Sequence, residues 1–311
     1  MVKKLLVVLV VIVMVFTGCS KKEESNTIKI GYIPITHALP LYIENELVKD
    51  NSKNLKLELV KFGSWPELAE ALNAGRIDGA SMLIELAVKA KEQGIDLKAV
   101  ALGHRDGNVV VVSKDVNTVE DLKGKSFAIP SKLSTHNILL HIMLKNKGLS
   151  YSDVNIVELP PPEMPAALSE GRISGYCVAE PFGAQSVAAD KGKTLFESHE
   201  LWEGSLCCGL VLRSDFIKNN SSLAQEFVKE YVDAGIKAEL KDEDVKEITS
   251  KYLKADAKVL DLSLQWISYE NLRMEEAEYN ELVNYMVETG LSENPPQYSD
   301  FVDNSLIDRV K

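Results

Sequence analysis

The sequence predicts a two-lobed α/β protein with a ligand cleft between the lobes, and three observations support this. Short β-like runs alternate with amphipathic helical stretches, which is typical of parallel sheets with helices on both faces. One part of this pattern occurs twice, which indicates two similar lobes. The 311 residues, 45% apolar and 26% charged, provide about two domains' worth of chain with enough apolar side chains for a core.

The expected elements follow from local patterns along the chain. The strands are short runs rich in aliphatic residues, at 28–33, 55–62, 109–113, 126–129, 154–159 and 209–213. The helices have apolar residues at i, i+3 and i+4, at 66–74, 135–147 and 163–170. The stretch from Phe216 to Lys311 is mostly helical by pattern, and we expect it to pack on the first lobe.

The internal repeat is clearest in Glu67–Gly79 and Glu163–Gly175, which agree at seven of thirteen positions with an offset of 96. Two further motifs recur in the same order: Ile33-Pro34 and Ile129-Pro130, then Thr36-His37 and Thr135-His136. This ordered agreement argues against chance similarity between two α/β segments. Two such lobes turn strand ends toward a shared crevice, where open α/β sheets bind ligands.

The repeat also predicts how the chain is divided. We expect lobe one to comprise residues 28–112 and 214–311, and lobe two to comprise residues 113–213. Val109–Asp115 would carry the chain from lobe one to lobe two, and Gly209–Asp215 would bring it back.

The N-terminus has the features of a lipoprotein signal peptide at 1–18, followed by a polar tether at 19–27. Lys3 and Lys4 precede the apolar run Leu5–Phe16, which is too short to span a hydrocarbon core of ~30 Å. Phe16–Cys19 resembles the bacterial lipobox, in which the cysteine is lipidated; an ordinary leader with an incidental cysteine is the alternative. We therefore expect a body anchored through Cys19, outside the cytoplasm, in the periplasm or on the outer face of the membrane.

Composition and motifs exclude several classes of function. A net charge of -11 is unfavourable for nucleic acid or anionic lipid headgroups. Four cysteines are too few for a disulfide framework. The sequence has no HExxH, GxSxG or P-loop motif, and no carboxylate pair suited to acid–base catalysis. We expect a binding protein without a cofactor rather than an enzyme.

Six motifs carry a resemblance to a known family: Gly31–Thr36, Ser64-Trp65, Gly75–Ala80, Ser134–Asn137, Glu180–Gly183 and His199–Trp202. With them the chain resembles solute-binding lipoproteins of ABC importers, in the nitrate, sulfonate, taurine and bicarbonate group. The resemblance implies a type II periplasmic-binding-protein fold, a monomer that closes over a small molecule, and docking on a membrane permease driven by a cytoplasmic ATPase. A thiamine-pyrimidine-type enzyme shares this fold and is a remote alternative, but the cysteine-rich signature of that group is missing.

The candidate ligand-binding residues come from strand ends and from this resemblance. Thr36-His37 and Thr135-His136 precede helix starts, where free N–H groups favour an anion, although either threonine can be only a cap. Glu180 ends a strand of lobe two and should face the crevice. The full set is Thr36, His37, Trp65, Met82, Asn108, Ser134, Thr135, His136, Glu180, Cys207 and Cys208.

Two classes of ligand remain open. The resemblance implies a lysine shortly after Leu201-Trp202 that balances an anion, but residues 203–209 contain no basic residue, which disfavours nitrate. A sulfonate-like or other organic anion is the favoured class. The alternative is a soft metal or an organometal bound by Cys207 and Cys208, with Cys177 nearby.

Two arguments weigh against the thiol ligand set. Adjacent strand residues face opposite sides, so only one of the two thiols is expected to reach the crevice. Free cysteine is also common in protein cores. Among the other histidines, we expect His104 and His199 to be surface or satisfied core residues, and we assign no role to His141.

Overall fold

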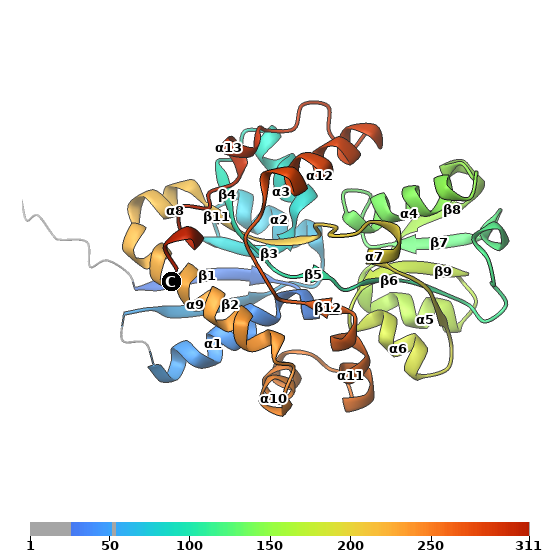
Figure 1. Ribbon diagram of the computed structural model, residues 1–311, viewed down its shortest axis with the longest axis horizontal. Helices are drawn as coiled ribbons and strands as arrows, with labels where there is room; N and C mark the ends of the chain where they lie inside the picture. The colour runs from blue at the N-terminus through green and yellow to red at the C-terminus, as the bar shows by residue number, and fades with distance from the viewer. Residues whose placement is uncertain (1–25, 52–53, 311) are drawn as a thin grey trace, which may run out of the picture.

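The computed structural model describes residues 26–51 and 54–310, so the expected signal peptide, Cys19 and most of the tether lie outside the described residues. Two five-stranded sheets form two lobes that lie side by side (Figure 1). Helices cover the sheets, which confirms the predicted two-lobed α/β class. No helix in the described ranges combines the length and the apolar character that crossing a bilayer would need.

The first sheet contains β1 (Thr27–Tyr32), β2 (Lys56–Lys61), β3 (Gly79–Leu83), β4 (Leu97–Leu102) and β11 (Cys208–Arg213). The second contains β6 (Asn108–Val112), β7 (Ser126–Ile129), β8 (Asn155–Glu158), β9 (Gly175–Ala179) and β10 (Lys193–Glu197). A third, two-stranded sheet pairs β5 (Arg105–Asp106) with β12 (Ile267–Ser268).

The helices before β11 are α1 (Leu39–Asn51), α2 (Trp65–Asn73), α3 (Ile84–Glu92), α4 (Thr135–Asn146), α5 (Met164–Ser169), α6 (Phe182–Ala188) and α7 (Ser198–Leu201). Those after it are α8 (Ser214–Asn219), α9 (Ser221–Glu239), α10 (Glu243–Tyr252), α11 (Ala257–Gln265), α12 (Glu276–Glu288) and α13 (Tyr298–Phe301). Short 3₁₀ turns include Thr36–Ala38, between β1 and α1.

The two sheets have the same topology. The strand order β2-β1-β3-β11-β4 of the first corresponds to β8-β7-β9-β6-β10 in the second. β3 and β9 begin at Gly79 and Gly175, the last residues of the repeated sequence motif. A Cβ on Gly79 would lie 2.4 Å from Leu212 Cδ2 and 2.5 Å from the Val211 carbonyl oxygen, so glycine is required where β11 packs beside β3. The repeat found in the sequence is therefore a repeat of structure.

The sheets are mixed rather than parallel, contrary to the prediction. β11 runs antiparallel to β3 and β4, and β6 runs antiparallel to β9 and β10. Each of these two strands enters its sheet from the other lobe. It therefore starts at the crevice, where its neighbours end, and runs against them.

The crossing strands also move the lobe boundaries. β6 was expected in lobe one and β11 in lobe two, because the boundaries were placed at 112/113 and 213/214. The structure pairs β6 with the second sheet and β11 with the first. Sequence pattern identifies such a strand but does not show on which side of a crossover it finds its partners.

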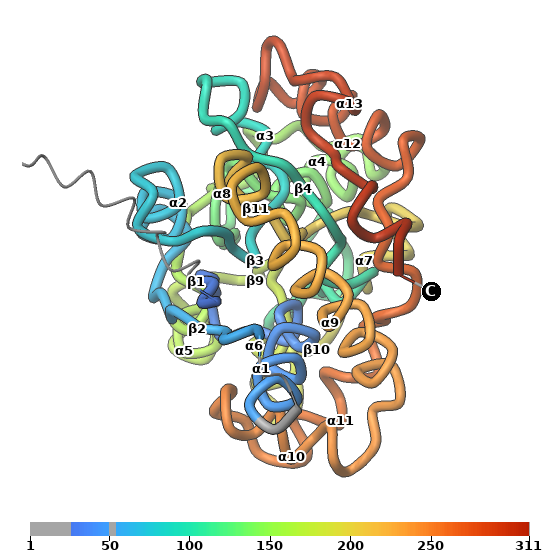
Figure 2. Tube along the Cα trace, turned by 90° about the vertical axis from the view of Figure 1, so that its left-hand side faces the viewer, coloured from blue at the N-terminus to red at the C-terminus, as the bar shows by residue number. Residues whose placement is uncertain are grey.

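The helical C-terminal part packs mainly on lobe one, as expected, but not entirely. α9 lies along α1 and α8 packs against β11 (Figure 2). In contrast, α11 packs against α6 of lobe two, and Tyr285 of α12 lies with its ring centroid 4.8 Å from that of Trp202. The C-terminal part therefore contacts both lobes.

Candidate functional site

Four buried side chains with metal-binding atoms meet where the first sheet faces lobe two. They are His37, His104, Cys207 and Cys208, and one donor atom from each lies within 4.8 Å of the others. Each residue is at most 1% exposed. His37 follows β1, His104 follows β4, and the two cysteines stand at the start of β11, so segments distant in the sequence meet at one edge of the sheet. We call these four residues the Cys/His cluster.

The distances among three of the four donor atoms fit a tetrahedral metal site, and a donor atom of His104 lies within 4.8 Å of each of them. The two Sγ atoms are 3.9 Å apart, and His37 Nδ1 lies 3.7 Å from Cys207 Sγ and 3.5 Å from Cys208 Sγ. Tetrahedral zinc, with Zn–S of about 2.3 Å and Zn–N of about 2.0–2.1 Å, requires S–S and S–N separations of about 3.8 and 3.6 Å. The centroids of the His37 and His104 rings lie 3.6 Å apart, with the ring planes tilted by 33°. This donor set matches a Cys₂His₂ site for a soft or borderline metal ion.

Local backbone structure brings both thiols to the same place. Cys207 precedes the first residue of β11, so the alternation of strand side chains does not separate it from Cys208. The Cys207 carbonyl accepts a hydrogen bond from Ile84 N at 2.9 Å, and the Cys208 carbonyl accepts one from Gly103 N at 2.8 Å. The expectation that only one thiol reaches the crevice is therefore wrong.

Gly103 allows this close approach of three chain segments. A Cβ there would lie 2.8 Å from the His37 carbonyl oxygen and 3.3 Å from that of Cys208. The backbone N–H of Cys208 donates to His104 Nε2 at 3.4 Å, which ties the third segment to the same point. His104 was expected to be a surface or satisfied histidine, and the structure instead places it among the cluster's donors.

The cluster's ionisation suits metal capture. Burial alone raises the pKa of the Cys207 thiol, but the hydrogen bond from Cys208 and the imidazoles of His37 and His104 lower it well below its usual value. Burial and the neighbouring Cys207 raise the pKa of Cys208 well above its usual value. Burial lowers the pKa of His104 to about 4, with a smaller contribution from His37. At neutral pH the site thus offers a thiolate, a thiol and a neutral imidazole at His104.

Lobe two covers the cluster with polar side chains. Asn108, at the start of β6, has Oδ1 3.8 Å from Cys207 Sγ and leaves its Nδ2 without a partner among the described residues. His136, in the first turn of α4, is 1% exposed, and neither ring nitrogen has a hydrogen-bond partner in the described part of the chain. Burial lowers the pKa of His136 to about 4, so its ring is neutral.

Thr135 joins the two lobes directly. Its hydroxyl is hydrogen-bonded to Glu85 Oε1 of α3 and donates to the Leu206 carbonyl at 2.6 Å. Burial, and secondarily the charge on Cys207, raise the pKa of Glu85 well above its usual value. A hydroxyl has only one proton, so a neutral Glu85 that donates to Thr135 satisfies both bonds. Sequence reasoning missed Glu85, because one glutamate on a helix carries no distinguishing signal.

A second bridge between the lobes joins Thr36 to Glu180. Both the N–H and the hydroxyl of Thr36 donate to the Glu180 carbonyl, at 2.9 and 3.2 Å. The Glu180 side chain was expected to face the crevice, but its Oε2 accepts from Ala184 N at 3.0 Å and is hydrogen-bonded to Ser263 Oγ at 2.9 Å. It therefore contacts α6 and α11, and burial raises its pKa to about 8.

The remaining candidates lie near strand and helix ends. Ser134 caps α4 and accepts from Asn137 N at 3.2 Å, which is a cap's role. Trp65 begins α2 and is 2% exposed, and its indole N–H finds no acceptor among the described residues. Met82 is fully buried in β3, opposite Gly209.

Two other histidines lie away from the cluster. His199 is half exposed and lies 3.6 Å from Glu197, which agrees with the expected surface position. His141, which received no role, stacks on Tyr151 with ring centroids 4.1 Å apart.

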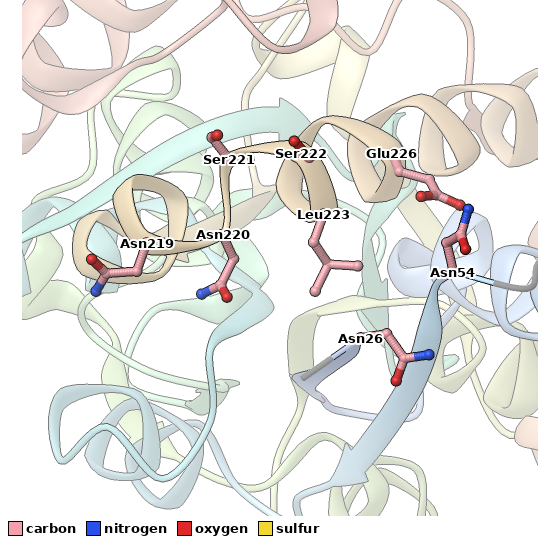
Figure 3. A pocket seen from close by; sticks show the side chains of 8 residues that line it. All are labelled: Asn26, Asn54, Asn219, Asn220, Ser221, Ser222, Leu223 and Glu226. Atoms are coloured by element: carbon pink, nitrogen blue, oxygen red, sulfur yellow. The ribbon is translucent and has the colours of Figure 1, made fainter. Parts of the chain in front are cut away.

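A separate pocket of about 390 Å³ lies on lobe one (Figure 3). Asparagine and serine side chains dominate its lining, from the segments before β1 and β2 and from the junction of α8 and α9. This pocket and the Cys/His cluster lie at opposite ends of β1, because Asn26 precedes the first residue of that strand and His37 follows the last. No candidate ligand-binding residue is part of it.

Comparison with curated proteins finds transport components. The chain is 28% identical over 239 residues to a nitrate/nitrite-binding protein of a Nostoc species, covering 68% of this chain and 54% of the relative. It is 31% identical over 178 residues to a taurine-binding periplasmic protein of Escherichia coli, covering 56% and 55%. A nitrate import ATP-binding protein of a Synechocystis species is 28% identical over 232 residues, or 68% of this chain and 35% of the relative. The chain thus spans about a third to a half of these relatives.

Solved structures share the fold over most of the chain. A ligand-binding component of an ABC-type import system from Staphylococcus aureus, solved with zinc bound, is 41% identical with a TM-score of 0.87, covering 92% of this chain and 99% of that one. The nitrate-binding protein of a Synechocystis species is 18% identical with a TM-score of 0.81, covering 92% and 88%. These likenesses confirm the predicted periplasmic-binding-protein fold. A family model matches residues 21–253, and the chain therefore belongs to the NMT1-like family.

Proposed function

We propose that this protein is the extracytoplasmic ligand-binding component of an ABC import system. It holds its ligand between two lobes and delivers it to a membrane permease that a cytoplasmic ATPase drives. The family, the fold and the importer components among its relatives support this role. It acts as a monomeric binding protein and not as an enzyme.

Lipidation of Cys19 anchors the protein to the membrane in this proposal. The apolar leader and the Thr-Gly-Cys sequence at 17–19 support it. The variant Cys19→Ala should be released from washed membranes in buffer without detergent. The control Cys177→Ala keeps Cys19 and should remain with the membranes. If Cys19→Ala also remains with them, the anchor lies elsewhere.

The ligand is a soft or borderline metal ion such as zinc, and the convergence of four donor atoms within 4.8 Å carries this assignment. The geometry matches the Cys₂His₂ ligand set described above. The zinc bound to the Staphylococcus aureus relative, at 41% identity, supports the same class of ligand.

An organic anion fits the Cys/His cluster poorly. No lysine or arginine is among the described residues that hydrogen-bond to its side chains. His104 and His136 are neutral, and the low pKa of Cys207 makes it a thiolate, which would repel a buried anion. The same thiolate attracts a metal cation. Between the two classes of ligand that the sequence left open, the geometry favours the metal.

The test is zinc binding by the full chain after treatment with a chelator and a thiol reductant. We expect one zinc per chain by equilibrium dialysis, and a rise in melting temperature with free zinc. At about 100 times the Kd the gain in stability is about 2.7 kcal/mol. Parallel titrations with nitrate and taurine should produce no such rise.

Two cysteine variants make the test specific. Cys207→Ser with Cys208→Ser should remove zinc binding, whereas Cys177→Ser, at a buried free cysteine outside the cluster, should retain it. Equal zinc binding by the double variant and the wild type would overturn the assignment. Stabilisation by nitrate or taurine, and not by zinc, would show that the ligand is an anion rather than a metal ion.

A further inference from the structure

A second pocket opens between the lobes and shares no residue with the Cys/His cluster. Its volume is about 280 Å³, and we call it the rim pocket. Lobe one contributes the end of β1, the end of β2 and the residues around the end of α10. Lobe two contributes the start of α6 and a proline before α5. We propose that the rim pocket binds an anion with an apolar body, such as a medium-chain carboxylate.

The apolar part of this ligand is defined by the walls. Ile33 and Phe62 face the pocket from lobe one, and Pro181 and Phe182 face it from lobe two. Ile33 is 1% exposed and Phe182 is 7% exposed, so firmly packed side chains form these walls. A pocket with mostly apolar walls and a few placed polar groups is typical of small-molecule sites, and this volume lies just below their usual range of about 300–1,000 Å³.

The anionic part is defined by two lysines. Lys61 and Lys254 line the rim pocket, and neither forms an ion pair or side-chain hydrogen bond with any described residue. No acidic side chain is among the described residues that line it. In a chain of net charge -11, two unpaired ammonium groups beside apolar walls form a local positive site.

Glu46, an acidic residue bonded to the pocket lining, already has partners for its negative charge. Glu46 accepts from Tyr252, a lining residue, at 2.7 Å and from Lys49 at 2.7 Å. These hydrogen bonds, led by that of Lys49, lower the pKa of Glu46 to about 2. The carboxylate of Glu46 thus keeps its own partners, which leaves Lys61 and Lys254 for a ligand.

Isothermal titration of the full chain with octanoate tests this proposal, because octanoate has a carboxylate and a short apolar tail. We expect one octanoate per chain, weaker binding by octanol, which lacks the charge, and none by acetate, which lacks the tail. Affinity should fall as salt rises, because both lysines are exposed. Lys61→Gln with Lys254→Gln should weaken octanoate binding about tenfold.

The matched control is Lys56→Gln, at the other end of β2 and outside the rim pocket. Its octanoate affinity should equal that of the wild type, and melting temperatures should show that all variants fold. Undetectable octanoate binding by the wild type, equal octanoate affinity in the double variant, or equal affinity for octanol and octanoate would each overturn the proposal. Zinc binding by the same samples reports on the Cys/His cluster separately, so the two assignments can fail independently.

Discussion

Replacing Glu180 with glutamine tests whether a neutral carboxyl is buried where lobe two meets α11. Burial raises the pKa of Glu180 to about 8 in the folded protein. The carboxyl of an unfolded chain titrates near 4.3. A neutral Glu180 can donate to Ser263 Oγ while Ser263 donates to the Val259 carbonyl, which satisfies both bonds of that hydroxyl.

The sign and size of the effect follow from these two pKa values. Because the folded pKa is raised, the stabilising contribution is complete below about pH 4.3 and is lost as pH rises toward 8. In this window one proton separates the folded and unfolded states, so stability falls by about 1.4 kcal/mol per pH unit. Glutamine does not titrate, so the stability of Glu180→Gln relative to wild type should rise by about 3 kcal/mol between pH 5 and 7.5.

The assay is urea unfolding at several pH values, without added metal. Glu44 and Glu85 also have pKa values raised by burial, but both proteins contain them, and their contribution cancels in the difference. The exposed control Glu120→Gln should follow the pH dependence of the wild type. If the free energy of unfolding depends on pH in the same way for wild type and Glu180→Gln between pH 5 and 7.5, no buried neutral carboxyl stands at this position.

Two further predictions concern the metal and the packing of lobe one. At pH 7 zinc binding should release about one proton from the two thiols, because Cys207 is already a thiolate and Cys208 is not. Calorimetry in buffers of different ionisation enthalpy measures the number of protons released. A release of two protons would contradict the assigned charges. Gly79→Ala should cost about 2–3 kcal/mol of unfolding free energy because of its 2.4 Å contact with Leu212. Gly63→Ala, with 3.6 Å to its neighbour Glu67, should cost less than about 1 kcal/mol, and equal losses would contradict the packing argument.

The fold was largely predictable because its signals are local. The motif Gly-Arg-Ile-x-Gly occurs before β3 and before β9, and it marks both copies of the repeat. The crossing strands β6 and β11 were found as strands but placed in the wrong lobe, since strand pairing depends on residues far away in the chain. The antiparallel pairing of β6 and β11, which makes both sheets mixed, could not be predicted for the same reason.

The candidate site was only partly predictable for a similar reason. His37, Cys207 and Cys208 stand in recognisable motifs, whereas His104 follows an ordinary apolar strand and joins them only through the order β3-β11-β4. The alternation argument against the cysteines failed because β11 begins at Cys208, one residue later than Cys207. The sequence pattern does not predict the exact first residue of a strand, and here that residue determines how many thiols reach the cluster.

The central claim is that the Cys/His cluster holds a metal ion, and X-ray absorption at the zinc edge tests it most directly. Full-length protein loaded with one zinc per chain should show two sulfur neighbours at about 2.3 Å and two nitrogen neighbours at about 2.0–2.1 Å. Cys207→Ser with Cys208→Ser should lose the sulfur shell, and Cys177→Ser should keep it. A spectrum of the wild type with only oxygen and nitrogen neighbours would contradict the account.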